Sequence, residues 1–227
     1  MRLDGSDFPA FFEAVHGVAP FPWQKALVEL LAAGEPWPDV LDLPTGAGKT
    51  AALDAAVFHL ALAADAPDRA AIRICFVVDR RIVVDDAFAR AEHLADALRA
   101  PADPVVEEVG RRLACLSTEG TPLVAARLRG GVPLEAPWAR SPTQPTVVSS
   151  TVDQIGSRLF FRGYGVSARM APVHAGLLAR DTLVLLDEAH LSEPFRQTLE
   201  AACEVGDAGL RVAVLSATPG SPPLRPL

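Results

Sequence analysis

Cysteine is scarce in this sequence, and its scarcity excludes two classes of site. The 227 residues contain three cysteines, Cys75, Cys115 and Cys203, which lie far apart and follow no paired spacing. Neither a disulfide framework nor a zinc site is therefore indicated, and three buried structural thiols are the expectation. The length suits one sizeable domain rather than two.

Long apolar runs are also missing, although half of the residues are hydrophobic. No run approaches the roughly 20 residues that cross a bilayer, and Asp4 and Asp7 interrupt the stretch that a signal peptide would need. We therefore expect a soluble, cytoplasmic chain with no membrane partner. The net charge of −7 argues against a bulk electrostatic grip on nucleic acid, so any nucleic-acid site must be local.

Lysine is the rarest of the basic residues, because only Lys25 and Lys49 occur and the other cations are arginines. A chain that otherwise uses arginine has kept a compact ammonium at Lys49. This choice is expected if the group must enter a small phosphate pocket.

Short runs rich in valine, isoleucine and leucine alternate with longer helical patterns, which predicts a parallel sheet covered on both faces. The expected strands are residues 39–43, 72–78, 112–117, 146–150, 182–187 and 211–216. The expected helices are residues 51–64, 82–100 and 192–205. Residues 119–146 and 162–176 contain prolines and glycines and predict long loops. The domain hypothesis is a helical segment over 1–35, an α/β lobe over 36–220 and a proline-rich tail over 221–227.

The stretch LDLPTGAGKT at 41–50 has the features of a phosphate cradle, although Leu43 stands where the usual pattern has a glycine. An apolar strand precedes it and a helical run follows, so backbone N–H groups and a helix dipole would face anionic oxygens. The expected lining is Thr45, Gly46, Ala47, Gly48, Lys49 and Thr50. Lys49 would neutralise the β- and γ-phosphates, and the Thr50 hydroxyl would hold Mg²⁺. The alternative is a glycine-rich turn that only caps a helix.

Two adjacent acids end the apolar run at 182–187, in the stretch LLDEAHL. Like charges at a strand end need a compensating cation, and Mg²⁺ is the natural one. Asp187 would bind the metal, directly or through water, and Glu188 would orient and deprotonate the water that attacks the γ-phosphate. His190 would follow as a coupling residue. A solvated turn is the alternative for the acidic pair alone, but a phosphate cradle earlier in the chain favours the metal site.

Ser216-Ala217-Thr218 ends a further apolar run. The hydroxyls of Ser216 and Thr218 could hydrogen-bond the acidic tip of a neighbouring strand and relay the state of the γ-phosphate. The three residues mean little alone. They gain specificity from the order of the three motifs, each at the carboxyl end of a strand, because open α/β sheets bind ligands at that edge.

Together these motifs resemble superfamily 2 helicases of the DEAD/DEAH-box type, whose first RecA-like lobe carries P-T-G-x-G-K-T, D-E-A-H and S-A-T in this order. The resemblance covers nearly the whole chain. It implies an α/β, RecA-like P-loop NTPase lobe with a mainly parallel sheet flanked by helices, and a Mg-dependent ATP hydrolase with ATP and Mg²⁺ as cofactors. In APFPWQKALV at 19–28 it implies that Gln24 contacts the adenine edge and Phe21 packs near the base; a surface helix residue is the alternative for Gln24.

Four segments look in addition like the helicase of type I CRISPR systems, nearest to the U or G subtype: VVDRRIVVDDA, LRGG, SSTVDQIGSRLFFRGYGVS and LLDEAHLSEPF. In that family the protein joins a guide-RNA complex on target DNA, translocates on the displaced single strand and cuts it with an HD-type nuclease domain. Carried over by motif, the DNA-backbone groove of this lobe would be lined by Arg80, Arg81, Arg129, Gly130, Gly131, Thr151, Asp153 and Gln154. Ordinary exposed arginines and a turn are the alternative.

The sequence departs from that family because it shows no second RecA-like lobe and no His-Asp dipeptide for an HD metal site. In the family the second lobe supplies arginine fingers, so we expect this chain to bind ATP with little turnover. The leading hypothesis is the ATP-binding lobe of a CRISPR-associated DNA translocase, with single-stranded DNA, a guide-RNA surveillance complex and the missing lobe and nuclease as partners. The alternatives are another superfamily 2 DNA or RNA motor, or a nucleotide-dependent binding module without turnover; a small-molecule kinase is disfavoured.

Overall fold

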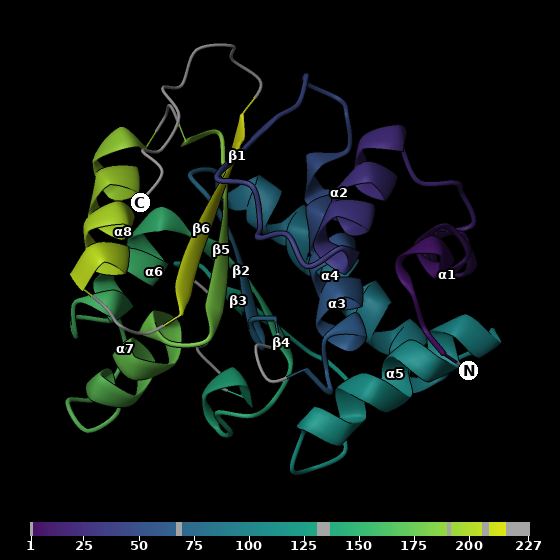
Figure 1. Ribbon diagram of the computed structural model, residues 1–227. Coiled ribbons are helices and arrows are strands. Elements are labelled where there is room, and N and C mark those ends of the chain that lie inside the picture. Colours follow the sequence, from purple (N-terminus) through teal and green to yellow (C-terminus); the bar gives the residue numbers. More distant parts are fainter. Residues whose placement is uncertain (1, 67–69, 131–136, 190–191, 206–208, 217–227) are drawn as a thin grey trace.

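The computed structural model describes residues 2–66, 70–130, 137–189, 192–205 and 209–216, which form an α/β fold (Figure 1). Six strands make one sheet in the order β1-β6-β5-β2-β4-β3, and every neighbouring pair is parallel. The strands are β1 (Val40–Asp42), β2 (Arg73–Val78), β3 (Val124–Leu128), β4 (Thr146–Thr151), β5 (Thr182–Asp187) and β6 (Leu210–Ser216). The expected fold class is confirmed, and the arrangement is consistent with a RecA-like lobe.

Helices cover both faces of the sheet (Figure 1). One face carries α1 (Phe8–His16), α2 (Pro22–Ala32), α3 (Ala52–Leu62), α4 (Arg81–Arg99) and α5 (Pro104–Leu116). The other carries α6 (Val152–Leu159), α7 (Ala171–Ala179) and α8 (Glu193–Val205). Short 3₁₀ turns are η1 (Gly5–Asp7), η2 (Lys49–Ala51) and η3 (Pro137–Ala139). The helices expected at 51–64, 82–100 and 192–205 are confirmed. Within the described part of the chain, no helix is long and apolar enough to cross a membrane.

The central strand β2 shows why the sequence carries continuous apolar runs. Its side chains alternate between two cores: Ile74 and Phe76 belong to the core under α1–α5, and Cys75 and Val77 belong to the core under α6–α8. Because both faces are covered, every residue of the strand is buried. A parallel sheet buried on both sides therefore loses the alternation of polar and apolar residues that marks a one-sided sheet.

The amino-terminal helices pack onto the lobe. Phe8 lies with its ring centroid 5.4 Å from that of Phe58 on α3. The fully buried carboxylate of Asp54, also on α3, lies 2.6 Å from His16 Nε2 and accepts a hydrogen bond from Arg90 Nε at 2.5 Å. A buried charge needs such partners. These contacts attach the end of α1 to α3, the helix that follows the phosphate-cradle sequence.

The strand expected at residues 112–117 is wrong, because these residues end helix α5. Asp103 caps that helix by accepting a hydrogen bond from Val105 N at 2.8 Å, and Pro104 occupies its first position. The buried Val106, Val109 and Leu113 recur at spacings of three and four. The helical period is visible only over the whole of 104–116, so a short apolar window at its end resembles a strand.

The sixth strand is instead β3, which lies inside the loop expected at 119–146. It pairs in parallel with β4, with Ala126 opposite Val148. Helix α7 likewise begins at Ala171, inside the loop expected at 162–176. Pro122 and Gly130 flank β3, and Pro172 and Gly176 lie within α7, so both short apolar patterns were read as loop.

The expectation of three buried thiols is only partly right. Cys75 is buried in β2, and burial raises the pKa of its thiol to about 12. Cys203 is partly buried and Cys115 is exposed near the end of α5. Cys115 is exposed because it belongs to the solvent face of a helix rather than to a strand.

Candidate functional site

The described residues of the three sequence motifs meet at the carboxyl ends of three adjacent strands. In the pairing of β5 with β6, Asp187 lies opposite Leu215. The backbone N–H of Leu43, just after β1, donates to Ser216 O at 2.8 Å, and the N–H of Glu188 donates to Leu215 O at 3.0 Å. Segments far apart in sequence therefore converge at one end of the sheet. We call the carboxyl ends of β1, β6 and β5 the lysine half of this edge.

Lys49 connects the cradle to the acids. Its Nζ lies 2.7 Å from Glu188 Oε1 and 3.8 Å from Asp187 Oδ1. The lysine side chain is only 9% exposed and that of Asp187 13%, whereas Glu188 remains 35% exposed. A buried ammonium is costly without a counter-charge, and the two carboxylates provide it. With one cation and two anions, this cluster has a formal charge of −1.

The cradle needs glycine at two positions. Gly46 has φ of +82° and Gly48 has φ of +70°, a region that other residues rarely adopt. At position 48 a β-carbon would also lie 3.1 Å from a ring carbon of Phe21. Thr50 follows within η2 and is partly buried, whereas Thr45 is exposed at the loop surface. The chain thus turns sharply beneath Phe21 before α3 begins.

The predicted adenine element lies against this turn. Phe21 is half exposed, while Gln24 is buried and its Oε1 accepts a hydrogen bond from Phe21 N at 3.0 Å. Trp23 Nε1 donates to Ala47 O at 2.8 Å, which ties α2 directly to the cradle. The sequence reasoning missed Trp23; its only signal was an indole N–H, a donor that usually finds an acceptor, next to Gln24.

The predicted nucleic-acid residues lie at the other part of the same edge, at the carboxyl ends of β2, β4 and β3, which we call the arginine half. Arg80 and Arg81 begin helix α4 and are both exposed. A β-carbon at Gly130 would lie 3.2 Å from an Arg81 guanidinium nitrogen, so the segments around residues 80 and 130 meet. Thr151 is buried at the end of β4, opposite Val78 of β2.

Two predicted groove residues have protein partners. Arg129 Nε lies 2.8 Å from Asp85 Oδ1, an oxygen that Arg127 NH1 also contacts at 2.9 Å. Gln154 is buried, and its Oε1 accepts a hydrogen bond from Arg158 NH1 at 2.6 Å. Both side chains are therefore held by contacts within the protein. Asp153, beside Gln154, is exposed in the first turn of α6.

Ser216 ends β6 and is buried. Its role as a coupling residue stays a prediction. His190, Thr218 and Gly131 lie outside the described residues. Among the residues that the structure does describe, no group of three or more His, Cys, Asp or Glu side chains could hold a metal ion. Mg²⁺ commonly takes one or two protein oxygens and completes its shell with phosphates and water. Asp187 and Thr50 fit that sparse mode.

A cavity of about 440 Å³ lies away from these motifs. It is lined by α2, α3 and the amino ends of β2, β5 and β6, with His59 and Arg211 among its polar groups. Burial, with a smaller contribution from Arg211, lowers the pKa of His59 to about 4, so the imidazole is neutral. This cavity lies at the opposite edge of the sheet from Lys49, and the chemistry-bearing motifs do not reach it.

No protein-family model matches this chain, and a search of curated proteins finds no significant match.

Proposed function

We propose that this chain is the ATP-binding lobe of an ATP-dependent DNA helicase or translocase. The observation that carries the proposal is the buried contact of Lys49 with Glu188 and Asp187, which joins a glycine-rich turn to an acidic strand tip. Phosphoryl transfer needs a cation for the phosphates, a carboxylate for the metal and a second carboxylate for the attacking water. The lysine half of the edge holds one group of each kind.

Nucleotide capture begins with an exchange of partners at Lys49. Its ammonium contacts Glu188, and phosphate oxygens would compete for it because they carry more charge. The N–H groups of the turn at Gly46 and Gly48 and the start of the following helix would add to that attraction. The exchange releases the Glu188 carboxylate for chemistry.

Bound Mg²⁺ would neutralise charge that develops on the phosphates, and Asp187 and Thr50 would hold it. Side chains of the protein would carry out the remaining steps. Glu188, which is partly exposed, would accept a proton from a water molecule aligned with the γ-phosphorus. The water oxygen forms the new P–O bond, the bond to the β-phosphate oxygen breaks, and ADP and phosphate leave. Phe21 and Gln24 would position the base above the turn.

The nucleic-acid part of the proposal is supported by the arginine half. Exposed Arg80 and Arg81 begin a helix at the same edge as Lys49, so a phosphate backbone there would lie beside the nucleotide. Contacts of this kind bind without reading sequence, as a motor requires. On the family resemblance we extend the proposal to a type I CRISPR system acting on foreign DNA in the cytoplasm, with a guide-RNA complex as partner.

A second candidate is a nucleotide-dependent binding module without turnover. The observation that favours it is the 2.7 Å contact of Lys49 with Glu188, because this contact occupies the expected general base. Another superfamily 2 motor is a third candidate, which differs in its preference for RNA over DNA.

Steady-state ATP hydrolysis with Mg²⁺ tests the proposal. The chain is measured alone, with single-stranded DNA and with RNA, beside Lys49→Ala and Glu188→Gln. We expect low turnover that DNA raises more than RNA, and that both substitutions reduce by about a hundredfold or more. Turnover that survives Glu188→Gln would contradict the assigned base. Stimulation by RNA alone would favour another motor, and ATP binding without any turnover would favour the binding module.

A further inference from the structure

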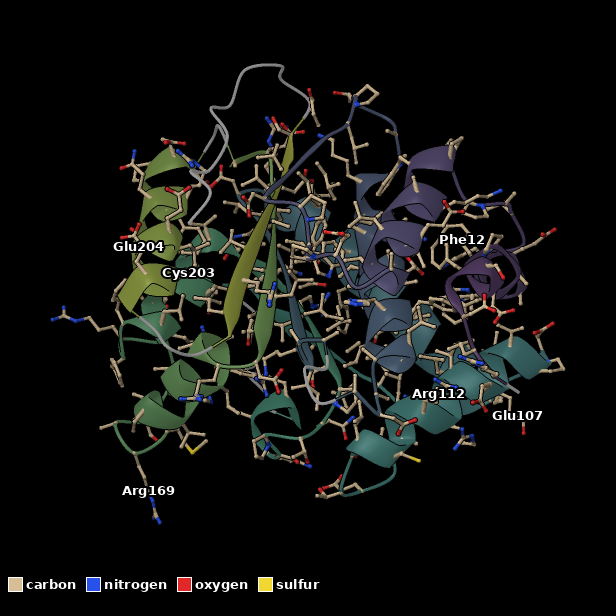
Figure 2. The ribbon with its side chains drawn as sticks, viewed as in Figure 1. Phe12, Glu107, Arg112, Arg169, Cys203 and Glu204 are labelled. Atoms are coloured by element: carbon tan, nitrogen blue, oxygen red, sulfur yellow. The ribbon has the colours of Figure 1, made fainter. Side chains whose placement is uncertain are left out.

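The segment between Asp153 and Asp181 differs in charge from the rest of the chain. Residues 154–180 contain four arginines and no aspartate or glutamate, in a protein with a net charge of −7. Arg158 is buried, but Arg162, Arg169 and Arg180 are exposed. Figure 2 shows Arg169 extending from the connection between α6 and α7 into solvent. The charged side chains of this segment are therefore all positive.

The same segment exposes aromatic rings. Phe160 is 55% exposed, and Phe161 and Tyr164 are each 61% exposed. Within the described ranges, only Phe21 among the other aromatic residues is exposed to a similar degree. We call residues 160–170, which join α6 to α7, the aromatic connection. Rings displayed together in one short connection need an explanation, because exposed apolar groups commonly mark binding sites.

The backbone of Phe161 is strained. Its φ is +61°, and it ends α6 with two hydrogen bonds: Phe161 N donates to Arg158 O at 3.1 Å, and Arg162 N donates to Ser157 O at 2.7 Å. These bonds form a Schellman motif with Phe161 at the position where glycine is preferred. A phenylalanine in the left-handed region costs conformational free energy, and its exposed ring gains little burial in return.

The remainder of the connection is fixed by its own hydrogen bonds. Val166 N donates to Gly163 O at 3.1 Å, and Ala171 N donates to Ser167 O at 3.0 Å. A β-carbon at Gly163 would lie 2.8 Å from Arg158 Cγ, so the turn packs closely on the end of α6. The rings are therefore presented by an ordered backbone, which lowers the entropic cost of binding.

We propose that the aromatic connection binds single-stranded nucleic acid, at a site separate from the arginine half of the sheet edge. Bases would stack on Phe160, Phe161 and Tyr164, and Arg162 and Arg169 would contact phosphates. The absence of any carboxylate from residues 154–180 favours a polyanion over a protein surface of mixed charge. Helix α6 has eight residues, so the connection lies about 12 Å along the helix from Thr151 at the edge. The site does not depend on ATP, so it goes beyond the proposed function.

Fluorescence anisotropy of a labelled oligothymidylate, without nucleotide, tests this site. All variants are made in a chain that already carries Arg81→Gln, because this change weakens nucleic-acid binding at the arginine half. The decisive variant is Phe161→Gly, because glycine suits the left-handed backbone and should leave the melting temperature unchanged or raise it. We expect the affinity to fall by about fivefold or more, as for the loss of a stacked base. Phe160→Ala with Tyr164→Ala should weaken binding further.

Leu30→Ala, an exposed apolar change on α2, is the matched control and should leave the affinity unchanged. The ATP affinity should be unchanged in Phe161→Gly, so a failed ATP site and a failed aromatic site give different patterns. An oligonucleotide affinity that is unchanged in Phe161→Gly and in the double variant would overturn the proposal. So would an absence of oligonucleotide binding by the parent chain, which would point to a protein partner instead.

Discussion

The lysine half and the arginine half of the sheet edge are built from the same kind of parallel strands, yet they use charge in opposite ways. In the lysine half, the buried ammonium of Lys49 forms ion pairs with the carboxylates of Asp187 and Glu188. In the arginine half, Arg80 and Arg81 are exposed, and Arg129 shares Asp85 with Arg127. A compact buried cation suits a small anion that must be enclosed, whereas extended guanidinium groups suit a long backbone that must slide past.

In the lysine half, Gly48→Ala is expected to lower both folding stability and ATP affinity. An alanine there would adopt an unfavourable φ of +70° and place its β-carbon 3.1 Å from Phe21. We expect a loss of about 1–2 kcal/mol in the free energy of unfolding and weaker ATP binding. Chemical denaturation and calorimetric titration measure the two effects.

Gly120→Ala is the matched control, because Gly120 has the same φ of +70° with nothing within 4 Å of its β-carbon. Gly120→Ala should lower the free energy of unfolding through backbone strain, with no close contact of the added β-carbon, and it should leave the ATP affinity unchanged. If both variants bound ATP equally well, the close packing of Phe21 on the cradle would have no role in the nucleotide site.

A smaller effect is expected from Arg81→Gln in the arginine half. Loss of one phosphate contact should weaken binding of single-stranded DNA by a few-fold and reduce its dependence on salt, with a slope smaller by about 0.7. ATP affinity measured without DNA should not change. Titrations of oligonucleotide at several salt concentrations provide the test.

Arg99→Gln changes an exposed arginine at the far end of the same helix and serves as its control. Equal loss of DNA binding in Arg81→Gln and Arg99→Gln would show that general charge, rather than the edge of the sheet, attracts the strand.

Local sequence patterns predicted the elements of the lysine half, because strand, glycine turn and helix follow one another within 41–62. The interactions that complete it are tertiary. The bond from Trp23 to Ala47 joins two separate elements, and no pattern within either element indicates it. The link of Asp85 on α4 with Arg129 beyond β3 is equally invisible in sequence. Helix α5 was not predicted, because its helical pattern can be recognised only over a window longer than a strand.

The aromatic connection was present in the sequence as LFFRGYG, but its importance depends on exposure and on one backbone angle. Phenylalanines near the end of a helix are usually buried, and the sequence does not show that Phe161 adopts a φ of +61°. Backbone strain at an exposed ring can be recognised only in the folded chain.

Calorimetric titration of ATP with Mg²⁺ into the unmodified chain, Lys49→Ala and Lys25→Ala shows whether Lys49 binds the nucleotide. The two substitutions remove the same side chain, once from the buried cluster and once from the partly buried surface of α2. We expect Lys49→Ala to weaken ATP binding by about tenfold to a hundredfold, the loss of a charge-assisted contact, and Lys25→Ala to bind as the parent does. No ATP binding by the parent, or equal binding by all three proteins, would contradict the assignment of the phosphate cradle.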